Sequence, residues 1–232
     1  MKTKYYFQTI LLAILACTSF TSCDEWYDND YLIARDIKGE WAGDFGMNFT
    51  YTFSYYGRHY EETFDSYDTD IAFIPDYQGA RQGWGRQVDY YQYGPYEKIY
   101  HEFDWRVRNE VLEIRYRRQN PGDPFLDTNI YRYELDNLWF TGFFDNTEVP
   151  FRLRKLANYN WTPYDNYNYY YYDRNNWYDS WYNHYGPFYA KTRSTSTDSI
   201  STINSNILPE YVDYSKIEGG KIISFGNRYT KK

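Results

Sequence analysis

The alternation between Ile99 and Val107 constrains the fold more than any other feature of this sequence. One set of alternate positions is apolar or aromatic apart from a histidine: Ile99, His101, Phe103, Trp105 and Val107. The positions between them are polar or charged, apart from one tyrosine, and a period of two predicts a half-buried β-strand. After a short turn at Asn109–Glu110 the same period resumes over Leu112–Tyr116. The two segments therefore predict an antiparallel hairpin.

The same period recurs on both sides of this hairpin. The further predicted strands are Ile37–Phe45, Thr69–Ile74, Gly83–Tyr91, Tyr131–Leu135, Leu138–Phe144 and Val149–Leu156. No stretch of this region has the period of an ordinary amphipathic helix. Seven or eight short strands in residues 36–156 are the size of one small sandwich or barrel. Pairing between neighbours and the advantage of hiding sheet edges favour an all-β fold, a small antiparallel up-and-down β-barrel.

The first residues have the order of a secretory signal. Lys2 and Lys4 precede an apolar run over Ile10–Ala16, and small residues follow up to Ser22. A positive start, an apolar middle and small residues at the cleavage site are typical of a signal peptide. The run is much shorter than the roughly 20 residues that span a bilayer. Residues 1–22 are therefore predicted to be removed.

The tetrapeptide Phe20–Cys23 resembles the lipobox of bacterial lipoproteins, with Phe where that family usually has Leu. The resemblance implies that Cys23 receives a diacylglyceryl group, that cleavage follows Ser22, and that the new amino terminus is acylated. Anchoring by two or more acyl chains is stable, whereas a single chain binds a membrane only marginally. The expected location is the bacterial outer membrane, with Cys23 as the contact to the lipid.

An acidic segment follows the lipidated cysteine, with four acids in the seven positions Asp24–Asp30. It resembles the tag by which some gut bacteria export lipoproteins to the outer face of the outer membrane. An equally good interpretation is a solvated tether whose acidity keeps it unfolded. Residues 23–35 are therefore predicted to be a lipid tether, and both interpretations of its acidity stay open.

Charge and cysteine content exclude several classes of function. Removal of Lys2 and Lys4 leaves 23 basic residues against 32 acidic ones, a net charge of −9. This argues against nucleic acid as a partner. Cys17 is lost with the signal and Cys23 carries lipid, so the mature chain has no disulfide and no thiolate site.

Three pieces of the β region resemble lipocalin-like domains of bacterial lipoproteins. Ile37–Trp41 contains a Gly-x-Trp, as at the first strand of that family, and Phe140–Phe144 with Val149–Lys155 resembles its closing strands. The alternating strand Ile99–Val107 fits the same pattern. The resemblance covers residues 36–156 and implies a barrel with a ligand site at its open end. The Tyr-rich stretch Met47–Asp68 is longer than the hairpin expected there.

Residues 157–232 form a C-terminal extension of different composition, expected to be largely irregular. Tyr, Asn, Asp and Trp dominate residues 158–189, and Ser and Thr dominate Thr192–Ser205. The first tract is predicted either to wrap the barrel or to contact a partner. Lys221–Phe225 is predicted to be a short strand. Within the Ser/Thr segment, Ser199 lies in a tripeptide that resembles the O-glycosylation sequon of exported bacterial proteins.

No catalytic or metal-binding motif occurs, so no cofactor and no metal are expected. A buried His101 is most often a structural residue with a hydrogen-bond partner, and ligand contact is the alternative. The residues predicted to line a ligand pocket are Trp84, His101, Phe103 and Trp105. The expected function is a non-enzymatic, membrane-anchored binding module for an apolar, aromatic or glycan ligand. The alternative is a structural or adhesion protein whose Tyr-rich extension contacts a protein or other partner.

Overall fold

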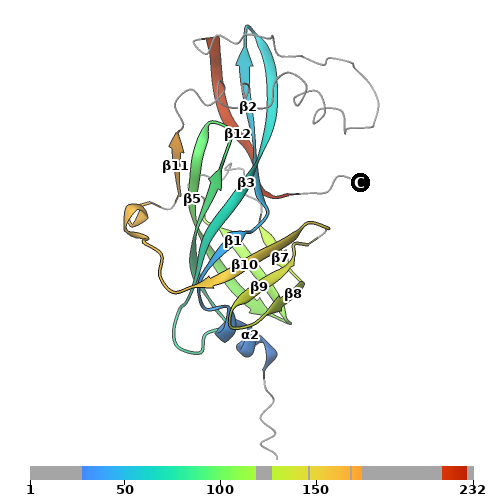
Figure 1. Ribbon diagram of the computed structural model, residues 1–232, viewed down its shortest axis with the longest axis vertical. Coiled ribbons are helices and arrows are strands. Elements are labelled where there is room, and N and C mark those ends of the chain that lie inside the picture. The colour runs from blue at the N-terminus through green and yellow to red at the C-terminus, as the bar shows by residue number, and fades with distance from the viewer. Residues whose placement is uncertain (1–27, 119–126, 146, 168, 174–215, 229–232) are drawn as a thin grey trace, which may run out of the picture.

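The computed structural model describes residues 28–118, 127–145, 147–167, 169–173 and 216–228, and only the backbone of 169–173 (Figure 1). The described elements are α2 (Asn29–Ile37), β1 (Gly39–Asp44), β2 (Met47–Tyr55), β3 (Arg58–Pro75), β4 (Gln82–Tyr91), β5 (Tyr96–Arg108), β6 (Val111–Tyr116), β7 (Thr128–Ile130), β8 (Arg132–Leu135), β9 (Trp139–Phe143), β10 (Pro150–Leu156), the 3-10 turn η1 (Thr162–Tyr164), β11 (Tyr169–Asp173) and β12 (Ile217–Asn227). All pairs of strands are antiparallel, and this confirms the all-β prediction.

Nine strands form a nearly closed barrel in the order β7-β6-β5-β4-β3-β1-β10-β9-β8. The strands at the two ends of this order, β7 and β8, are consecutive in the chain with only Tyr131 between them. A hydrogen bond from the Asp145 amide to the Asn129 carbonyl, 3.0 Å long, also joins the β9–β10 connection to β7. Pairing follows the chain from β3 to β7, as predicted, but β1 pairs with β3 and β10 and not with β2.

The long strand β3 belongs to two sheets. Its first half, Arg58–Asp65, pairs with β2, and the segment from Ser66 to Pro75 pairs with β4, with β1 on its other side over Thr69–Phe73. The stretch Met47–Asp68 is therefore a hairpin that extends beyond the barrel, and β12 adds to its free edge (Figure 1). The predicted strand at Lys221–Phe225 is confirmed as part of this longer β12.

The helix α2 packs against one end of the barrel, where the sequence predicted only a tether. Asp28 caps the helix by accepting a hydrogen bond from the Asp30 amide. Ile37 is fully buried, and its carbonyl accepts a hydrogen bond of 2.7 Å from Trp41 Nε1. The segment predicted as a tether thus contains, from Asn29, most of a helix that packs on the barrel.

The same helix also holds the predicted β5–β6 hairpin, whose turn the structure confirms. Asn109 and Glu110 have φ angles of 53° and 64°, which a tight hairpin turn requires. The Asp30 carboxylate accepts a hydrogen bond from each of their amides, at 2.9 and 2.7 Å. The N-terminal segment therefore stabilises a turn about 80 residues away in the chain.

Candidate functional site

The four residues predicted to line a ligand pocket lie on two faces of the sheet. His101, Phe103 and Trp105 point into the barrel and are 0%, 0% and 2% exposed. Trp84 is half-buried on the outer face, where the Arg86 guanidinium lies 5.0 Å from its ring centre. Its only described link to the other three is its carbonyl oxygen, which accepts a hydrogen bond from Trp105 Nε1.

Aromatic rings fill the barrel interior around Phe103 and Trp105. The Phe73 ring centre lies 5.4 Å from that of Phe103 and 5.9 Å from that of Trp105. Phe73 in turn contacts Phe140 at 6.5 Å, and Phe140 contacts Phe151 at 4.8 Å. Side chains can fill the interior of a barrel of about eight strands. The rings here occupy the place that a ligand would take in an open barrel.

A cluster of buried polar side chains lies next to these rings, around His101. The Asp89 carboxylate accepts hydrogen bonds from Thr69 at 2.6 Å and from Gln87 at 2.9 Å, and His101 Nε2 lies 3.3 Å from it. The Tyr116 hydroxyl donates to Gln87 at 3.1 Å. Burial, together with the charge of Asp89, raises the pKa of Tyr116, which therefore stays protonated. These contacts place His101 inside a buried polar cluster, next to the Asp89 carboxylate.

The C-terminal strand covers this polar cluster. The Phe225 ring is fully buried, with its centre 4.6 Å from the His101 ring and 6.0 Å from the Tyr116 ring. Two residues later, Asn227 Oδ1 accepts a hydrogen bond of 2.6 Å from Thr128 of β7. The barrel is thus closed by α2 at one end and by β12 at the other.

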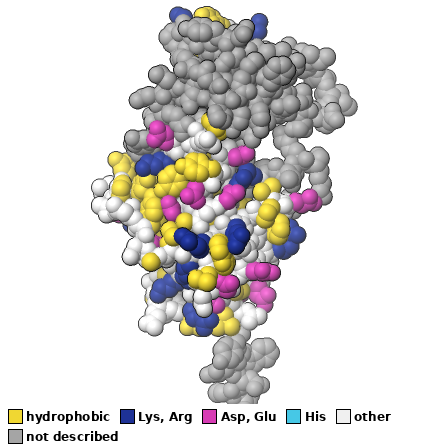
Figure 2. Space-filling model, in the orientation of Figure 1, with side chains coloured by type: hydrophobic (Ala, Val, Ile, Leu, Met, Phe, Trp, Pro, Cys, Tyr) yellow, Lys and Arg dark blue, Asp and Glu magenta, His cyan; other side chains and the backbone are white. Residues whose placement is uncertain are grey.

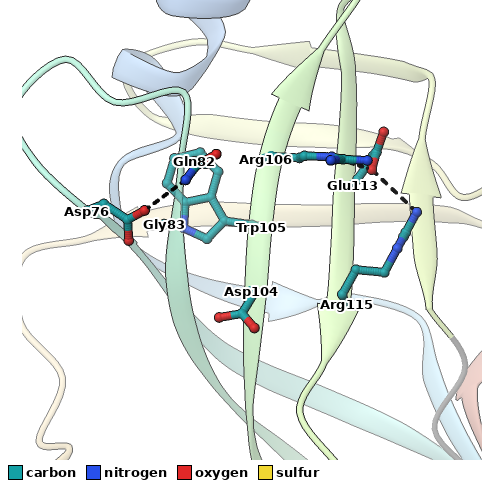
Figure 3. A pocket seen from close by; sticks show the side chains of 8 residues that line it. All are labelled: Asp76, Gln82, Gly83, Asp104, Trp105, Arg106, Glu113 and Arg115. Carbon is teal, nitrogen blue, oxygen red and sulfur yellow. Dashed lines mark hydrogen bonds and ion pairs between the residues drawn. The ribbon is translucent and has the colours of Figure 1, made fainter.

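A cleft of about 420 Å³ lies on the outer face of the barrel (Figure 3). Its lining comes from β4, β5, β6 and the connection before β4: Asp76, Gln82, Gly83, Asp104, Trp105, Arg106, Glu113 and Arg115. Neighbouring side chains hold several of these groups in place. Gln82 donates to Asp76 at 3.1 Å, and Arg106 Nε donates to Glu113 at 2.7 Å.

Glu113 organises the charges along one side of the cleft. Its carboxylate lies 2.7 Å from Arg106, 3.4 Å from Arg115 and 3.6 Å from Arg108. Burial opposes its ionisation, but the hydrogen bond from Arg106 and the three positive charges outweigh burial and lower the pKa of Glu113. The side chains of Arg106 and Arg108 remain 51% and 63% exposed. Three guanidinium groups thus share one carboxylate and still face solvent.

Of the cleft residues, sequence reasoning selected only Trp105, which it expected inside the barrel, and it placed Asp104, Arg106, Glu113 and Arg115 on the outer face of their hairpin. Arg106 faces Glu113 and Asp104 faces Arg115 in the β5–β6 register. Opposite charges at facing positions of a predicted hairpin were the available signal. Asp76, on the connection before β4, could not be assigned to the cleft from any local sequence pattern. On the face in Figure 2, acidic and basic side chains lie next to one another among hydrophobic ones.

The first residues of the C-terminal extension pack across the outer face of β4 and β5. The Tyr164 ring stacks on the buried Tyr100 ring with centres 4.6 Å apart. Trp161 Nε1 donates to Glu40 at 3.0 Å, and Asp165 pairs with Arg86 at 2.9 Å. We call residues 157–167 the strap. For this part of the Tyr-rich tract, wrapping of the barrel is confirmed.

Asp70 lies on the outer face among acids and strap residues. Burial raises its pKa to about 6, and the neighbouring charges of Asp68 and Glu40 act in the same direction. A hydrogen bond from Tyr90 partly opposes this shift. Tyr90 in turn shares a hydrogen bond of 2.8 Å with Tyr159 of the strap. Ionisation of Asp70 therefore places a charge beneath the strap.

Comparisons with protein-family models, with curated proteins and with solved structures found no match. Among the described residues, no group of three or more His, Cys, Asp or Glu could hold a metal ion. In the same part of the chain, no helix is long and apolar enough to cross a membrane. Cys23 and Ser199, predicted to carry lipid and glycan, lie outside the described residues.

Proposed function

We propose that this chain is a lipid-anchored, non-enzymatic binding protein of the bacterial outer membrane, related to lipocalin-like lipoproteins. In this proposal its barrel is a solid scaffold and its ligand is a carbohydrate that docks in the outer cleft. The signal peptide and the lipobox resemblance at Cys23 support the anchor. Replacement of Cys23 by serine should abolish incorporation of labelled palmitate, and continued labelling of the variant would contradict the proposal.

The observation that carries the binding site is the contrast between the filled interior and the polar outer cleft. Phe73 and Phe140 occupy the interior, so an apolar ligand would have to displace packed rings. The cleft instead offers fixed guanidinium, carboxylate and amide groups, which suit the many hydroxyls of a sugar. Trp84 lies on the same face, directly opposite Asp104 in the β4–β5 register, with the Arg86 and Arg117 guanidinium groups 5.0 and 5.9 Å from its ring centre.

The exposed guanidinium groups beside the cleft suit a sugar that carries a carboxylate or a sulfate. Arg106, Arg108 and Arg115 all lie within 3.6 Å of the Glu113 carboxylate, and Arg115 also pairs with Asp127 at 3.7 Å. Asp76 and Asp104 line the same cleft, so its charges are mixed. A planar guanidinium binds a carboxylate or sulfate through paired hydrogen bonds. Binding of an acidic sugar should therefore weaken as salt is added, whereas binding of a neutral sugar should not.

The test is a glycan array followed by calorimetry on residues 24–232, which include every described residue. Arg106→Ala should weaken binding of the selected glycan at least tenfold, on the basis of about 1.5–3 kcal/mol for a charged hydrogen bond. Arg154→Ala, on the exposed face of β10, is the matched control and should leave binding unchanged. Equal binding by both variants, or no glycan bound on the array, would contradict the proposal.

Exposed tyrosines favour the alternative, an adhesion protein. Tyr56, Tyr67, Tyr77 and Tyr131 are between 53% and 68% exposed, and tyrosine is enriched at protein contact surfaces. Deletion of the whole extension cannot test the role of the Tyr-rich tract, because β12 belongs to the fold. Replacement of residues 174–215 by a Gly/Ser linker of equal length keeps β12. Loss of cell-surface adhesion with unchanged glycan binding would favour this alternative.

A further inference from the structure

The strand β12 is fastened mainly at its C-terminal end. Residues 217–223 are exposed or half-buried, whereas Phe225, Gly226 and Asn227 are buried. The pairing with β2 shifts register twice, once across Gly219–Gly220 and once between Ile222 and Ser224. Ile217 and Ile222 pack partly buried against the core, whereas Gly219 and Gly220 between them are exposed. Register is weakly specified in Gly-rich strands, so the first half of β12 fixes its register less firmly than the buried residues 225–227 do.

Residues 225–228 hold β12 in a groove that β2, β7 and the β1–β2 turn form. Phe225 covers His101, and Asn227 accepts the hydrogen bond from Thr128. The Arg228 amide donates to the Gly46 carbonyl at 2.7 Å, and its guanidinium pairs with Asp44. We call this place the β12 groove. The groove binds the aromatic ring of Phe225 and, two residues later, the side-chain amide of Asn227.

The groove requires an occupant. Without Phe225, the polar cluster around Asp89 and His101 would open to solvent at this end of the barrel. The edge of β2 would also lose the partner for its backbone groups. A strand from a second copy of the chain would restore each of these contacts, because it has the same sequence.

The connection to β12 is long enough for exchange between copies. Between the ends of β11 and β12 lie 43 residues, from 174 to 216. Such a segment could reach roughly 140–155 Å if fully extended. A connection of 43 residues holds its strand at an effective concentration on the order of 1 mM, so a neighbouring copy can compete at comparable local concentration.

We infer that β12 is an exchangeable strand and that the β12 groove accepts the C-terminal strand of a second copy of this chain. Exchange converts monomers into strand-swapped assemblies without any new contact. Copies that are crowded on a surface would exchange more than copies in dilute solution. The balance depends on the concentration of neighbouring copies relative to the effective concentration of the chain's own strand. This inference does not depend on the carbohydrate proposal.

The experiment is disulfide trapping in residues 24–232, which contain no cysteine. Thr50 and Ser224 face one another in the register and are both half-buried, so cysteines there leave the core intact. A chain with Thr50→Cys is mixed with a chain with Ser224→Cys and oxidised. A mixed disulfide dimer should form, about a tenth of the protein at 0.1 mM, and its yield should rise with concentration.

Controls separate exchange from chance collision of thiols. Glu218→Cys pairs with Ser54 in the register and so is mismatched with Thr50→Cys, and this mixture should give no dimer above background. Phe225→Ala should lower the dimer yield severalfold in the Ser224→Cys donor and raise it in the Thr50→Cys acceptor.

When Thr50→Cys and Ser224→Cys are combined in one chain, their disulfide should form within the monomer. The register pair Thr52→Cys and Lys221→Cys repeats the test at an independent position. If the in-chain pairs close but mixed chains give only the mismatched background at every concentration, the strand is permanent and the inference is overturned.

Discussion

Replacement of Asp70 by asparagine should stabilise the protein at neutral pH and leave its stability unchanged in acid. Burial raises the pKa of Asp70 from 3.8 to about 6 in the folded chain, so the unfolded state loses this proton first. The stability that the protonated carboxyl contributes is complete below pH 3.8 and is lost as the pH rises through about 6. Asparagine remains neutral and can still accept the hydrogen bond from Tyr90.

The magnitude follows from the size of the shift. About two pKa units correspond to about 3 kcal/mol at full effect. The Asp70 carboxyl is only half-buried, and water screens part of this energy, so we expect a gain of about 1–2 kcal/mol at pH 7. Against wild type, the difference should shrink steadily from pH 7 to pH 4.5.

The assay is urea unfolding followed by tryptophan fluorescence at several pH values between 4.5 and 7.5. Asp136→Asn is a control of opposite sign, because two backbone amides bind its exposed carboxylate and lower its pKa. That variant should lose stability at neutral pH, since the Asp136 contribution is present there and disappears in acid. A difference for Asp70→Asn that is constant with pH, or a loss at pH 7, would refute the reasoning.

Three further predictions concern packing. Phe140→Ala should lower the free energy of unfolding by about 3–5 kcal/mol in urea titrations, and Phe140→Leu by clearly less; equal losses would mean a loosely packed core. Gly85→Ala should abolish folding, checked by circular dichroism, because the added carbon would lie 2.1 Å from the Phe103 ring and 2.5 Å from the Ala72 carbonyl oxygen. Tyr164→Ala should expose the strap to limited proteolysis while the barrel stays folded, and an uncut strap would contradict the packing on Tyr100.

The strands were predictable because half-buried strands alternate inward and outward along the chain. The β5–β6 hairpin follows from Ile99–Val107, Leu112–Tyr116 and the turn between them, all local features. The helix α2 was missed because it has only nine residues and follows an acidic segment, and because it depends on contacts such as that of Ile37 with Trp41. The same reasoning placed His101 inside correctly, but it could not identify Asp89, an inward acid of the adjacent strand, as its partner.

The ligand site was less predictable than the fold. Alternation assigns a side chain to a face but does not say whether space remains beside it. Trp84 was grouped with Trp105 by kind, although their strands place them on opposite faces. The outer cleft combines Asp76 with Arg115, which are 39 positions apart, and no local pattern relates them.

The sequence by itself determined that this chain forms half-buried antiparallel strands, because an alternating side-chain pattern fixes which face each residue occupies. It also determined the signals that predict lipid attachment at Cys23. Only the tertiary structure decided that rings meet across the interior around Phe73 and fill it, since the distance between opposite walls depends on closure of the whole sheet. It also decided that Phe225, at the far end of the chain, seals the barrel above His101, because that contact joins strands 124 positions apart.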